Sequence, residues 1–315
     1  MKSKTILPAL LICALAAAAF CACLTGCSDG VSETTTHQTD ETSSSENEPE
    51  PSEEGMYDTT AVANAYISGD TSGLSEYDLA IYNAAAEALN TFYTDGMSAY
   101  DAVLAAHDYV VTHVTYDLGE LALIGSRAEE SDSPYGALID GKAICSGYTT
   151  TFKLFMDMIG VECITVDGSA LDEVHAWNMV NIDGKWYHVD CTWDDYTPDY
   201  EGRPAAHIYF LVTDEVMRRE HVWDEDTTPS ADSDDLNYYV NNGLYVTSVS
   251  QASEIIAREV AHHATEVELM LDKELNAGGI PLSYPEGVGG YSYWLNEFES
   301  YNVVIYHVLW RKSQE

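Results

Sequence analysis

Three residues in the middle of the chain, Cys145, His175 and Asp190, have the types and the order needed for nucleophilic acyl transfer. In that chemistry a thiolate attacks a carbonyl carbon, an imidazole moves the proton, and a carboxylate holds the imidazole in the required tautomer. The three residues lie in separate parts of the sequence, so the fold must bring them together. The elements around each residue therefore decide whether this chemistry is available.

The segment that follows Cys145 is predicted to be a helix that begins at this cysteine. Its apolar residues recur at spacings of four, three and four, which marks one helix face, and Gly160 stands where a helix would stop. The apolar residues are Tyr148, Phe152, Phe155 and Ile159. The unpaired N–H groups and the dipole of a helix start favour an anion. This position therefore predicts a thiol that is activated as the thiolate.

A β-hairpin is predicted to carry the other two residues. Asp183-Gly184 is a strong two-residue turn signal between two runs rich in β-branched and aromatic residues. If this pair forms the turn, Ile182 faces Lys185, and counting outward makes His175 and Asp190 diagonal neighbours on one face. Such neighbours are roughly 7–8 Å apart at the backbone, which lets their side chains form a hydrogen bond.

The motifs around these residues resemble the transglutaminase-like superfamily, in the form found on bacterial surface proteins. They read Gly-Lys-Ala-Ile-Cys145-Ser-Gly-Tyr, His175-Ala-Trp-Asn and Trp186-Tyr-His-Val-Asp190-Cys-Thr-Trp193-Asp, and the resemblance covers about residues 98 to 225. It implies an α+β fold with a papain-like core, in which N-terminal helices and a central helix bearing Cys145 pack on an antiparallel sheet. It does not choose among protein cross-linking, peptide hydrolysis, deamidation and a fold retained without catalysis.

Several other residues near the motifs are candidates for a role in the site. His188 shares a strand face with Asp190 and competes for the role of base, but only His175 matches the His-Ala-Trp pattern of the family. Four aromatic residues are candidates for an oxyanion donor or a cleft wall, although aromatic residues on strands are more often core. These four are Tyr135, Tyr148, Trp177 and Trp193.

The sequence offers no recognisable metal or cofactor motif. There is no Cys-x-x-Cys pair and no phosphate-binding glycine loop, so neither a metal nor a nucleotide cofactor is expected. His107 and His113 are six residues apart, on different faces of a predicted helix, and are expected to be structural or surface residues. Cys163 and Cys191 are expected either to form a disulfide or to remain as two buried thiols.

The N-terminus predicts export and a lipid anchor. Residues 1–26 have a basic start followed by an apolar stretch, the layout of a secretory signal peptide. Leu-Thr-Gly-Cys27 resembles the lipobox of bacterial lipoproteins, which implies a lipidated Cys27. The alternative is an apolar segment retained as a transmembrane anchor. Residues 27–55 are rich in Ser, Thr and acidic residues and are predicted to be a disordered tether.

The remaining chain is divided into a transglutaminase-like domain at 56–228 and a C-terminal α/β extension at 232–315. Helices are expected near 74–89 and 98–111, and a polar loop at 167–173 is expected to lead to the histidine. A strand is predicted at 207–212. In the extension, a hairpin is predicted at 238–246, helices at 252–263 and 293–299, and strands at 265–270 and 303–310.

Charge and location narrow the choice of partners. The formal net charge of −40 becomes −42 when a leader that carries two lysines and no acid is removed, which argues against binding to nucleic acid. The leading hypothesis is a lipid-anchored enzyme on the extracytoplasmic face of the bacterial membrane. Its thiol would act on amides of a protein or peptide substrate, including cell-wall peptide. The alternative is a surface-binding module that keeps the fold without turnover.

Overall fold

The computed structural model describes residues 55–118, 130–195, 205–298 and 301–311. The predicted leader, Cys27 and the tether as far as residue 54 lie outside the described residues, as does the segment 196–204 that follows the predicted hairpin. Within the described ranges, no helix is both long enough and apolar enough to cross a membrane.

Three helices open the described part of the chain, namely α2 (Thr60–Ser68), α3 (Glu76–Phe92) and α4 (Ala99–His113). The helices expected near 74–89 and 98–111 are confirmed as α3 and α4. Each begins at a serine, Ser75 or Ser98, whose side chain accepts a hydrogen bond from a backbone N–H of the first turn. These caps satisfy donors that a helix start otherwise leaves unpaired.

The predicted central helix is α6 (Cys145–Ile159), with Cys145 as its first residue and Gly160 as its left-handed C-cap at φ 79°. It follows two short elements, a π-helical turn η1 (Gly136–Asp140) and the strand β2 (Lys142–Ala143), which pairs in parallel with β1 (Thr115–Tyr116). Most of α6 is buried, because the face with the apolar residues packs into the main core.

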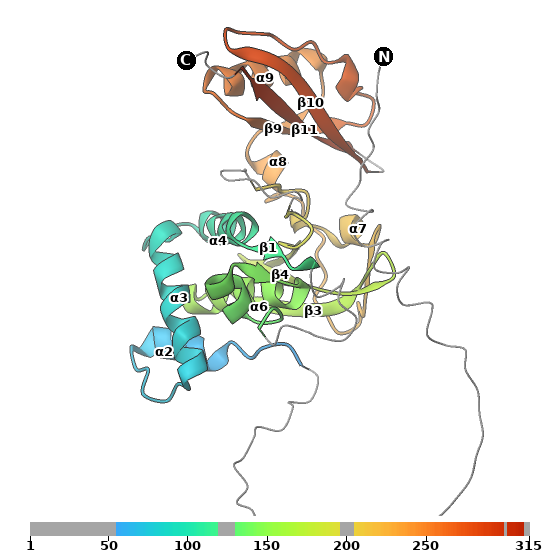
Figure 1. Ribbon diagram of the computed structural model, residues 1–315. Helices are drawn as coiled ribbons and strands as arrows, with labels where there is room; N and C mark the ends of the chain where they lie inside the picture. The colour runs from blue at the N-terminus through green and yellow to red at the C-terminus, as the bar shows by residue number, and fades with distance from the viewer. Residues whose placement is uncertain (1–54, 119–129, 196–204, 299–300, 312–315) are drawn as a thin grey trace, which may run out of the picture.

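A five-stranded antiparallel sheet lies against α6 (Figure 1). The strand order is β6-β5-β4-β3-β7, and neighbouring strands all run antiparallel. The bounds are β3 (Cys163–Ala170), β4 (Glu173–Ile182), β5 (Lys185–Val189), β6 (Phe210–Val212) and β7 (His221–Trp223). The predicted α+β architecture, a cysteine-bearing helix packed on an antiparallel sheet, is thus confirmed.

The turn between β4 and β5 has the predicted conformation. Asp183 and Gly184 both have positive φ, 54° and 83°, as a type I′ hairpin turn requires. Ile182 pairs with Lys185, which is the predicted register.

The prediction of a polar loop at 167–173 is wrong. The strand β3 continues to Ala170, and the connection to β4 is a tight turn in which Leu171 and Asp172 have φ values of 50° and 68°. β3 pairs with β4 on one side and with β7 on the other, so its backbone groups are satisfied in spite of its polar side chains. The strand predicted at 207–212 is shorter than expected, because only Phe210–Val212 pairs.

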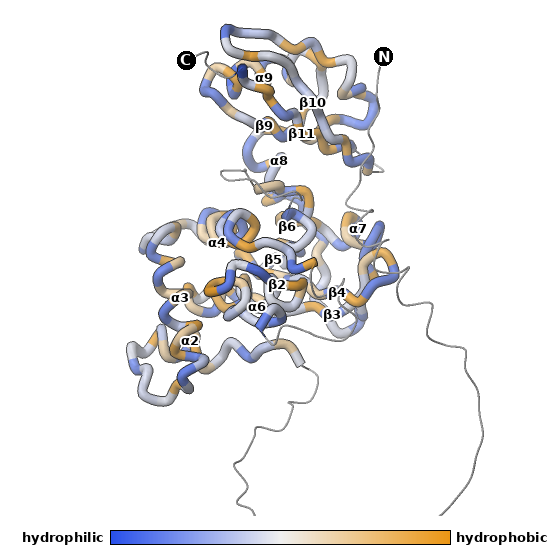
Figure 2. Tube along the Cα trace, in the orientation of Figure 1, coloured by the Kyte–Doolittle hydropathy of each residue, from blue (hydrophilic) through white to orange (hydrophobic). Residues whose placement is uncertain are grey.

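A second, four-stranded sheet forms the C-terminal unit, reached through α7 (Asp214–Met217) and α8 (Tyr238–Asn241). Its strand order is β10-β11-β9-β8, and its elements are β8 (Tyr245–Val246), α9 (Val249–Ala261), β9 (Glu266–Asp272), η2 (Ala277–Gly279), β10 (Val288–Glu297) and β11 (Tyr301–Trp310). Figure 1 places this unit at the opposite end of the molecule from α2 and α3. Along α9 hydrophobic and hydrophilic residues are interspersed (Figure 2), and its buried apolar residues belong to one hydrophobic cluster with those of the sheet.

The predicted helix 252–263 and the strands 265–270 and 303–310 correspond to α9, β9 and β11, but two other predictions for this unit are wrong. The expected hairpin at 238–246 is a helical turn, α8, capped by Asn237, followed by β8 in parallel with β9. Residues 293–297 of the helix expected at 293–299 lie instead in β10, which pairs with β11, and residue 299 lies outside the described residues. Nine cross-strand residue pairs outweigh the weak helical pattern there.

Both units share a hydrophobic cluster. Met270 and Ile305 of the C-terminal sheet belong to the same buried cluster as Trp177 of the five-stranded sheet. Polar contacts cross at the same place, since His207 bonds Glu268 of β9 at 2.7 Å and Asn242 donates to the hydroxyl of Tyr100 at 2.8 Å. The C-terminal unit is therefore packed directly on the first.

Candidate active site

Cys145 lies at the first position of α6 and is partly exposed. The helix start sits unusually close to the preceding chain. A Cβ on Gly147 would lie 2.5 Å from the carbonyl oxygen of Ser131 and 2.7 Å from the Cβ of Ala143. Only glycine fits this approach, which explains the Cys-Ser-Gly sequence of the motif.

Hydrogen bonds fix α6 to β4 beside the site. Thr149 donates its hydroxyl proton to the carbonyl of Ala176 at 2.9 Å, and the amide of Asn178 donates to the carbonyl of Thr149 at 3.2 Å. Both contacts are buried, so they are strong constraints on the distance between helix and strand. They set the position of the thiol relative to His175, which precedes Ala176 on the strand.

His175 and Asp190 are in direct contact, as the hairpin register predicts. His175 Nε2 lies 2.7 Å from Asp190 Oδ2, and both side chains are buried. The other carboxylate oxygen, Oδ1, accepts the backbone N–H groups of Thr192 at 3.0 Å and Trp193 at 3.1 Å. The chain just after β5 thus holds the carboxylate in one orientation.

The thiol of Cys145 completes the arrangement. Burial alone would lower the pKa of His175, but the charge and hydrogen bond of Asp190, together with a hydrogen bond from Cys145, raise it to about 10. Burial alone would raise the pKa of Asp190, but the His175 charge holds it well below its usual range. Since Nε2 is bonded to the carboxylate, Nδ1 is left for the thiol. The three residues therefore gather at one place, with His175 bonded to Asp190 and Cys145 near enough to the ring to affect its pKa.

A second imidazole, that of His221, contacts the same carboxylate oxygen, and the sequence did not predict it. His221 Nε2 lies 3.0 Å from Asp190 Oδ2, and its other nitrogen is buried without a hydrogen-bond partner. The two histidines come from β4 and β7, which flank β3, where Gly168 faces His175 and Ala170 faces His221. These small residues leave room for both rings.

His188, the alternative base, has other partners. Its Nδ1 accepts the indole N–H of Trp177 at 3.0 Å, and its Nε2 donates to Asp214 at 2.9 Å. Burial lowers the pKa of His188 and keeps the ring neutral. His188 thus lies on the predicted face but serves to anchor Trp177.

The four aromatic candidates differ in how close they lie to the site. The ring of Trp193 lies 6.1 Å from His175 and 4.6 Å from His221, so it adjoins the site. Trp177 stacks behind His175 but is buried, and Tyr148 is buried and donates to Asp195. Tyr135 stacks on Tyr77 of α3 at 5.0 Å. Trp193 is the candidate best placed to meet a substrate.

Cys163 and Cys191 are free thiols rather than a disulfide, and both are buried. Burial raises the pKa of each thiol, so neither is available as a thiolate. Among the described cysteines, only Cys145 combines exposure with a neighbouring base.

Two groups among the described residues have three ligand atoms close enough together to hold a metal ion. One is His175, Asp190 and His221. The other combines His107 and Asp108 of α4 with His207. Neither group was expected from sequence spacing, because each draws on segments far apart in the chain.

The fold is that of a transglutaminase-like domain. Residues 87–191 match the family model described as the transglutaminase-like superfamily, and Cys145, His175 and Asp190 all lie in this range. The chain therefore contains a transglutaminase-like domain, as the motifs indicated.

Two curated relatives carry the name kyphoscoliosis peptidase. The chain is 28% identical over 123 residues to the Mus musculus protein, an alignment that covers 34% of this chain and 18% of that protein. It is 29% identical over 105 residues to the Homo sapiens protein, which covers 30% of this chain and 15% of that protein. The chain thus spans less than a fifth of the length of these relatives.

Two solved structures are similar to part of the chain. A crystal structure of a TGase is 22% identical with a TM-score of 0.32, covering 44% of this chain and 38% of its own. A candidate cysteine protease from Cytophaga hutchinsonii is 19% identical with a TM-score of 0.29, covering 36% of this chain and 37% of its own.

Proposed function

We propose that this protein is an enzyme in which Cys145 attacks the carbonyl carbon of a protein or peptide amide. The observation that carries the proposal is the buried hydrogen bond of His175 to the Asp190 carboxylate, on a ring whose pKa the neighbouring Cys145 thiol also raises. An imidazole held in this way can take the thiol proton and stabilise the resulting ion pair. Holding charged groups in a buried place costs stability. Groups with strongly shifted pKa values are therefore concentrated at functional sites.

The reaction has two steps. The Cys145 thiolate forms a bond to the carbonyl carbon, the C–N bond breaks, and the leaving amine takes its proton from the His175 imidazolium. The product is a thioester on Cys145. An incoming amine or a water molecule then gives its proton to His175 and attacks the thioester carbonyl carbon. The C–S bond breaks, which releases the cross-linked, deamidated or hydrolysed product and restores the Cys145 thiolate beside the His175 imidazolium. The backbone N–H of Cys145, at a helix start, is a donor for the oxyanion.

The peptide-hydrolysis branch draws support from the name of the two relatives, kyphoscoliosis peptidase. Trp193, beside both histidines, would pack against the substrate. We also propose that the protein is exported and anchored to the outer face of the bacterial membrane through a lipid on Cys27, where proteins and wall peptides are within reach. This rests on the signal-peptide layout and the lipobox resemblance.

The test traps the thioester. The purified chain is incubated with amide-containing peptides and quenched in acid, and the mass added to the Cys145 peptide is measured. The same reactions are scored for incorporation of a labelled amine and for new peptide termini. Covalent adducts are expected in the wild type and in Cys163→Ala, a matched control that removes a buried thiol, but not in Cys145→Ala.

If no substrate leaves an adduct and Cys145 reacts with iodoacetamide no faster than a free thiol at pH 6, the enzymatic proposal is wrong. The protein would then be a surface-binding module. Lipidation is tested separately by fractionating cells that express the wild type or Cys27→Ser, since only the wild type is expected with the membrane.

A further inference from the structure

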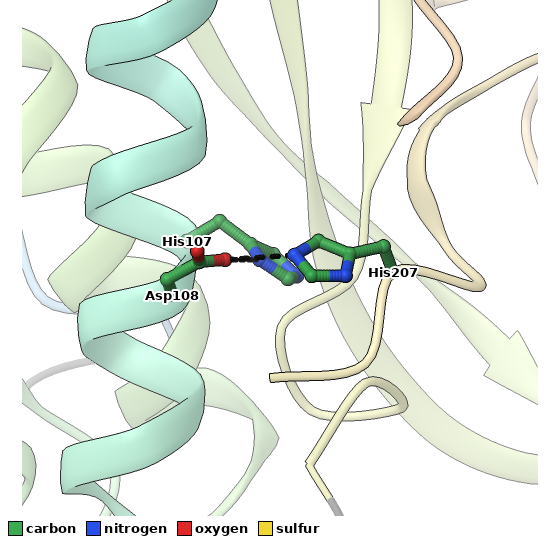
Figure 3. A group of neighbouring side chains, drawn as sticks. All are labelled: His107, Asp108 and His207. Carbon is green, nitrogen blue, oxygen red and sulfur yellow. Dashed lines mark hydrogen bonds and ion pairs between the residues drawn. The ribbon is translucent and has the colours of Figure 1, made fainter. Parts of the chain in front are cut away.

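A second cluster of histidines and carboxylates lies apart from the triad. His107 and Asp108 lie on α4, and His207 comes from the segment that leads into β6 (Figure 3). His107 Nδ1 and His207 Nε2 both lie 3.0 Å from the same oxygen, Asp108 Oδ1. His107 is fully buried and His207 nearly so, whereas 42% of the Asp108 side chain is exposed.

Each of these rings also contacts another carboxylate through its outer nitrogen. His107 Nε2 lies 3.1 Å from Asp194 Oδ2, and His207 Nδ1 lies 2.7 Å from Glu268 Oε2. Asp194 is itself fixed by the backbone N–H of Tyr209, at 3.0 and 3.1 Å from its two oxygens. Both outer carboxylates are therefore part of a rigid frame.

This pattern leaves an electrostatic problem at the centre. An ionised carboxylate only accepts hydrogen bonds, and a neutral imidazole has one N–H and one lone pair. If both rings are neutral and donate their outer N–H groups to Asp194 and Glu268, the inner nitrogens of His107 and His207 turn lone pairs toward Asp108. The centre is then satisfied in one of two ways, by a second proton on each ring or by a cation bound between the two nitrogens and the carboxylate oxygen.

We propose that His107 Nδ1, His207 Nε2 and Asp108 Oδ1 bind a divalent transition-metal ion of the Zn²⁺ class. Two imidazoles and a carboxylate are a donor set that such ions prefer. Ligand atoms about 2.0–2.1 Å from a tetrahedral ion are about 3.3 Å apart, so the observed 3.0 Å contacts need only open slightly. The Asp108 side chain is partly exposed, so the ion can be reached from solvent on that side.

The outer carboxylates support the assignment. Metal-binding histidines usually donate their second N–H to a carboxylate, which fixes the tautomer and strengthens the ligand. Asp194 and Glu268 occupy these positions on the two rings. Tyr238 also stacks on the His207 ring, with 3.6 Å between centroids, and restricts its rotation.

The ion would fasten three parts of the molecule at one point. His107 belongs to α4, His207 to the approach to β6, and Glu268 to β9 of the C-terminal unit. Asp194 follows Asp190 by one turn, and its N–H bonds the Asp190 carbonyl at 3.2 Å. The site thus joins the C-terminal unit to the segment that orients the triad carboxylate.

The test is Co²⁺ and Zn²⁺ binding by the full chain, purified without a histidine tag and with excess Mg²⁺ to mask weak acidic sites. The background is Cys145→Ala, so that the thiol does not contribute. We expect a single bound equivalent, a visible Co²⁺ absorption band and a rise in Tm with Zn²⁺. His207→Gln and Asp108→Asn should lose all three, and Glu268→Gln should weaken affinity about 10–100-fold.

Two matched variants separate this site from the rest of the chain. His113→Gln changes an exposed histidine of the same helix and should bind like the background protein, as should His221→Gln in the other histidine group. No stoichiometric binding to the background protein, or binding retained in both His207→Gln and Asp108→Asn, overturns the proposal. The proposal is also overturned if His221→Gln loses metal binding while His207→Gln retains it. Asp108 is partly exposed and asparagine has nearly the same shape as aspartate, so Asp108→Asn still tests the proposal if His207→Gln does not fold.

Discussion

Replacing Asp190 by asparagine tests how the triad works, because the substitution keeps the shape and reverses one hydrogen bond. Oδ1 accepts two backbone N–H groups, from Thr192 and Trp193, so the asparagine must keep its oxygen there. Its NH₂ group then occupies the place of Oδ2 and faces the Nε2 atoms of His175 and His221 as a donor. His175 must respond by placing its proton on Nδ1, where it blocks acceptance of the thiol proton.

The structure gives the scale of the loss. A pKa of about 10 for His175, against an ordinary 6.5, corresponds to roughly 5 kcal/mol in favour of the imidazolium. Asp190 is the largest contribution that raises this pKa, so most of the stabilisation disappears in the variant. An ordinary thiol, with a pKa of about 8.5, is only about 0.3% thiolate at pH 6. Alkylation of Cys145 at pH 6 should therefore slow by a factor on the order of 10².

The assay is the rate of iodoacetamide modification of Cys145 at pH 6, followed by mass spectrometry of its peptide. Cys163 and Cys191 are buried and serve as internal reporters of folding, because they react only if the variant unfolds. Asp183→Asn is the matched control, since Asp183 is exposed and Asn-Gly is a favoured type I′ turn. A folded Asp190→Asn protein that reacts at the wild-type rate would refute the reasoning.

Three further outcomes follow from the sheet. His221→Phe removes one donor from the triad carboxylate and should slow alkylation of the nucleophile roughly tenfold; an unchanged rate would mean that the second imidazole has no positioning role. Burial lowers the pKa of His188, so the unfolded chain takes up its proton near pH 6.5 while the folded protein does not. The free energy of unfolding should therefore fall as the pH drops below 6.5, and denaturant titrations of His188→Gln should show a smaller fall. A Cβ at position 168 would lie 2.3 Å from the carbonyl oxygen of Val222. Gly168→Ala should destabilise the protein by on the order of 3 kcal/mol in urea titrations, whereas Gly73→Ala, which meets open space, should not.

The parts of the site that follow local rules were predictable from the sequence. A glycine-terminated helical pattern placed Cys145 at the start of α6, and the Asp183-Gly184 turn fixed the register that brings His175 to Asp190. A turn with two positive φ values leaves one register available, so a count of residues was sufficient.

The parts that depend on long-range pairing were not predictable. His221 lies on a three-residue strand that pairs with β3, about fifty residues earlier, and no local pattern marks it. The cluster of His107, Asp108 and His207 has no ligand spacing in the sequence, because tertiary packing alone brings α4 to the segment before β6. The same cause explains β10, where pairing with β11 overrides a weak helical pattern.

The nucleophile and its base belong to different layers, since Cys145 starts a helix and His175 lies on the sheet beneath it. Their encounter is a contact between residues thirty positions apart, held by the buried bonds of Thr149 and Asn178. A slight separation of the two layers abolishes the sulfur–imidazole contact while each layer keeps its secondary structure. Reactivity of this thiol therefore reports the closeness of helix and sheet, and on heating it should vanish before circular dichroism detects any melting.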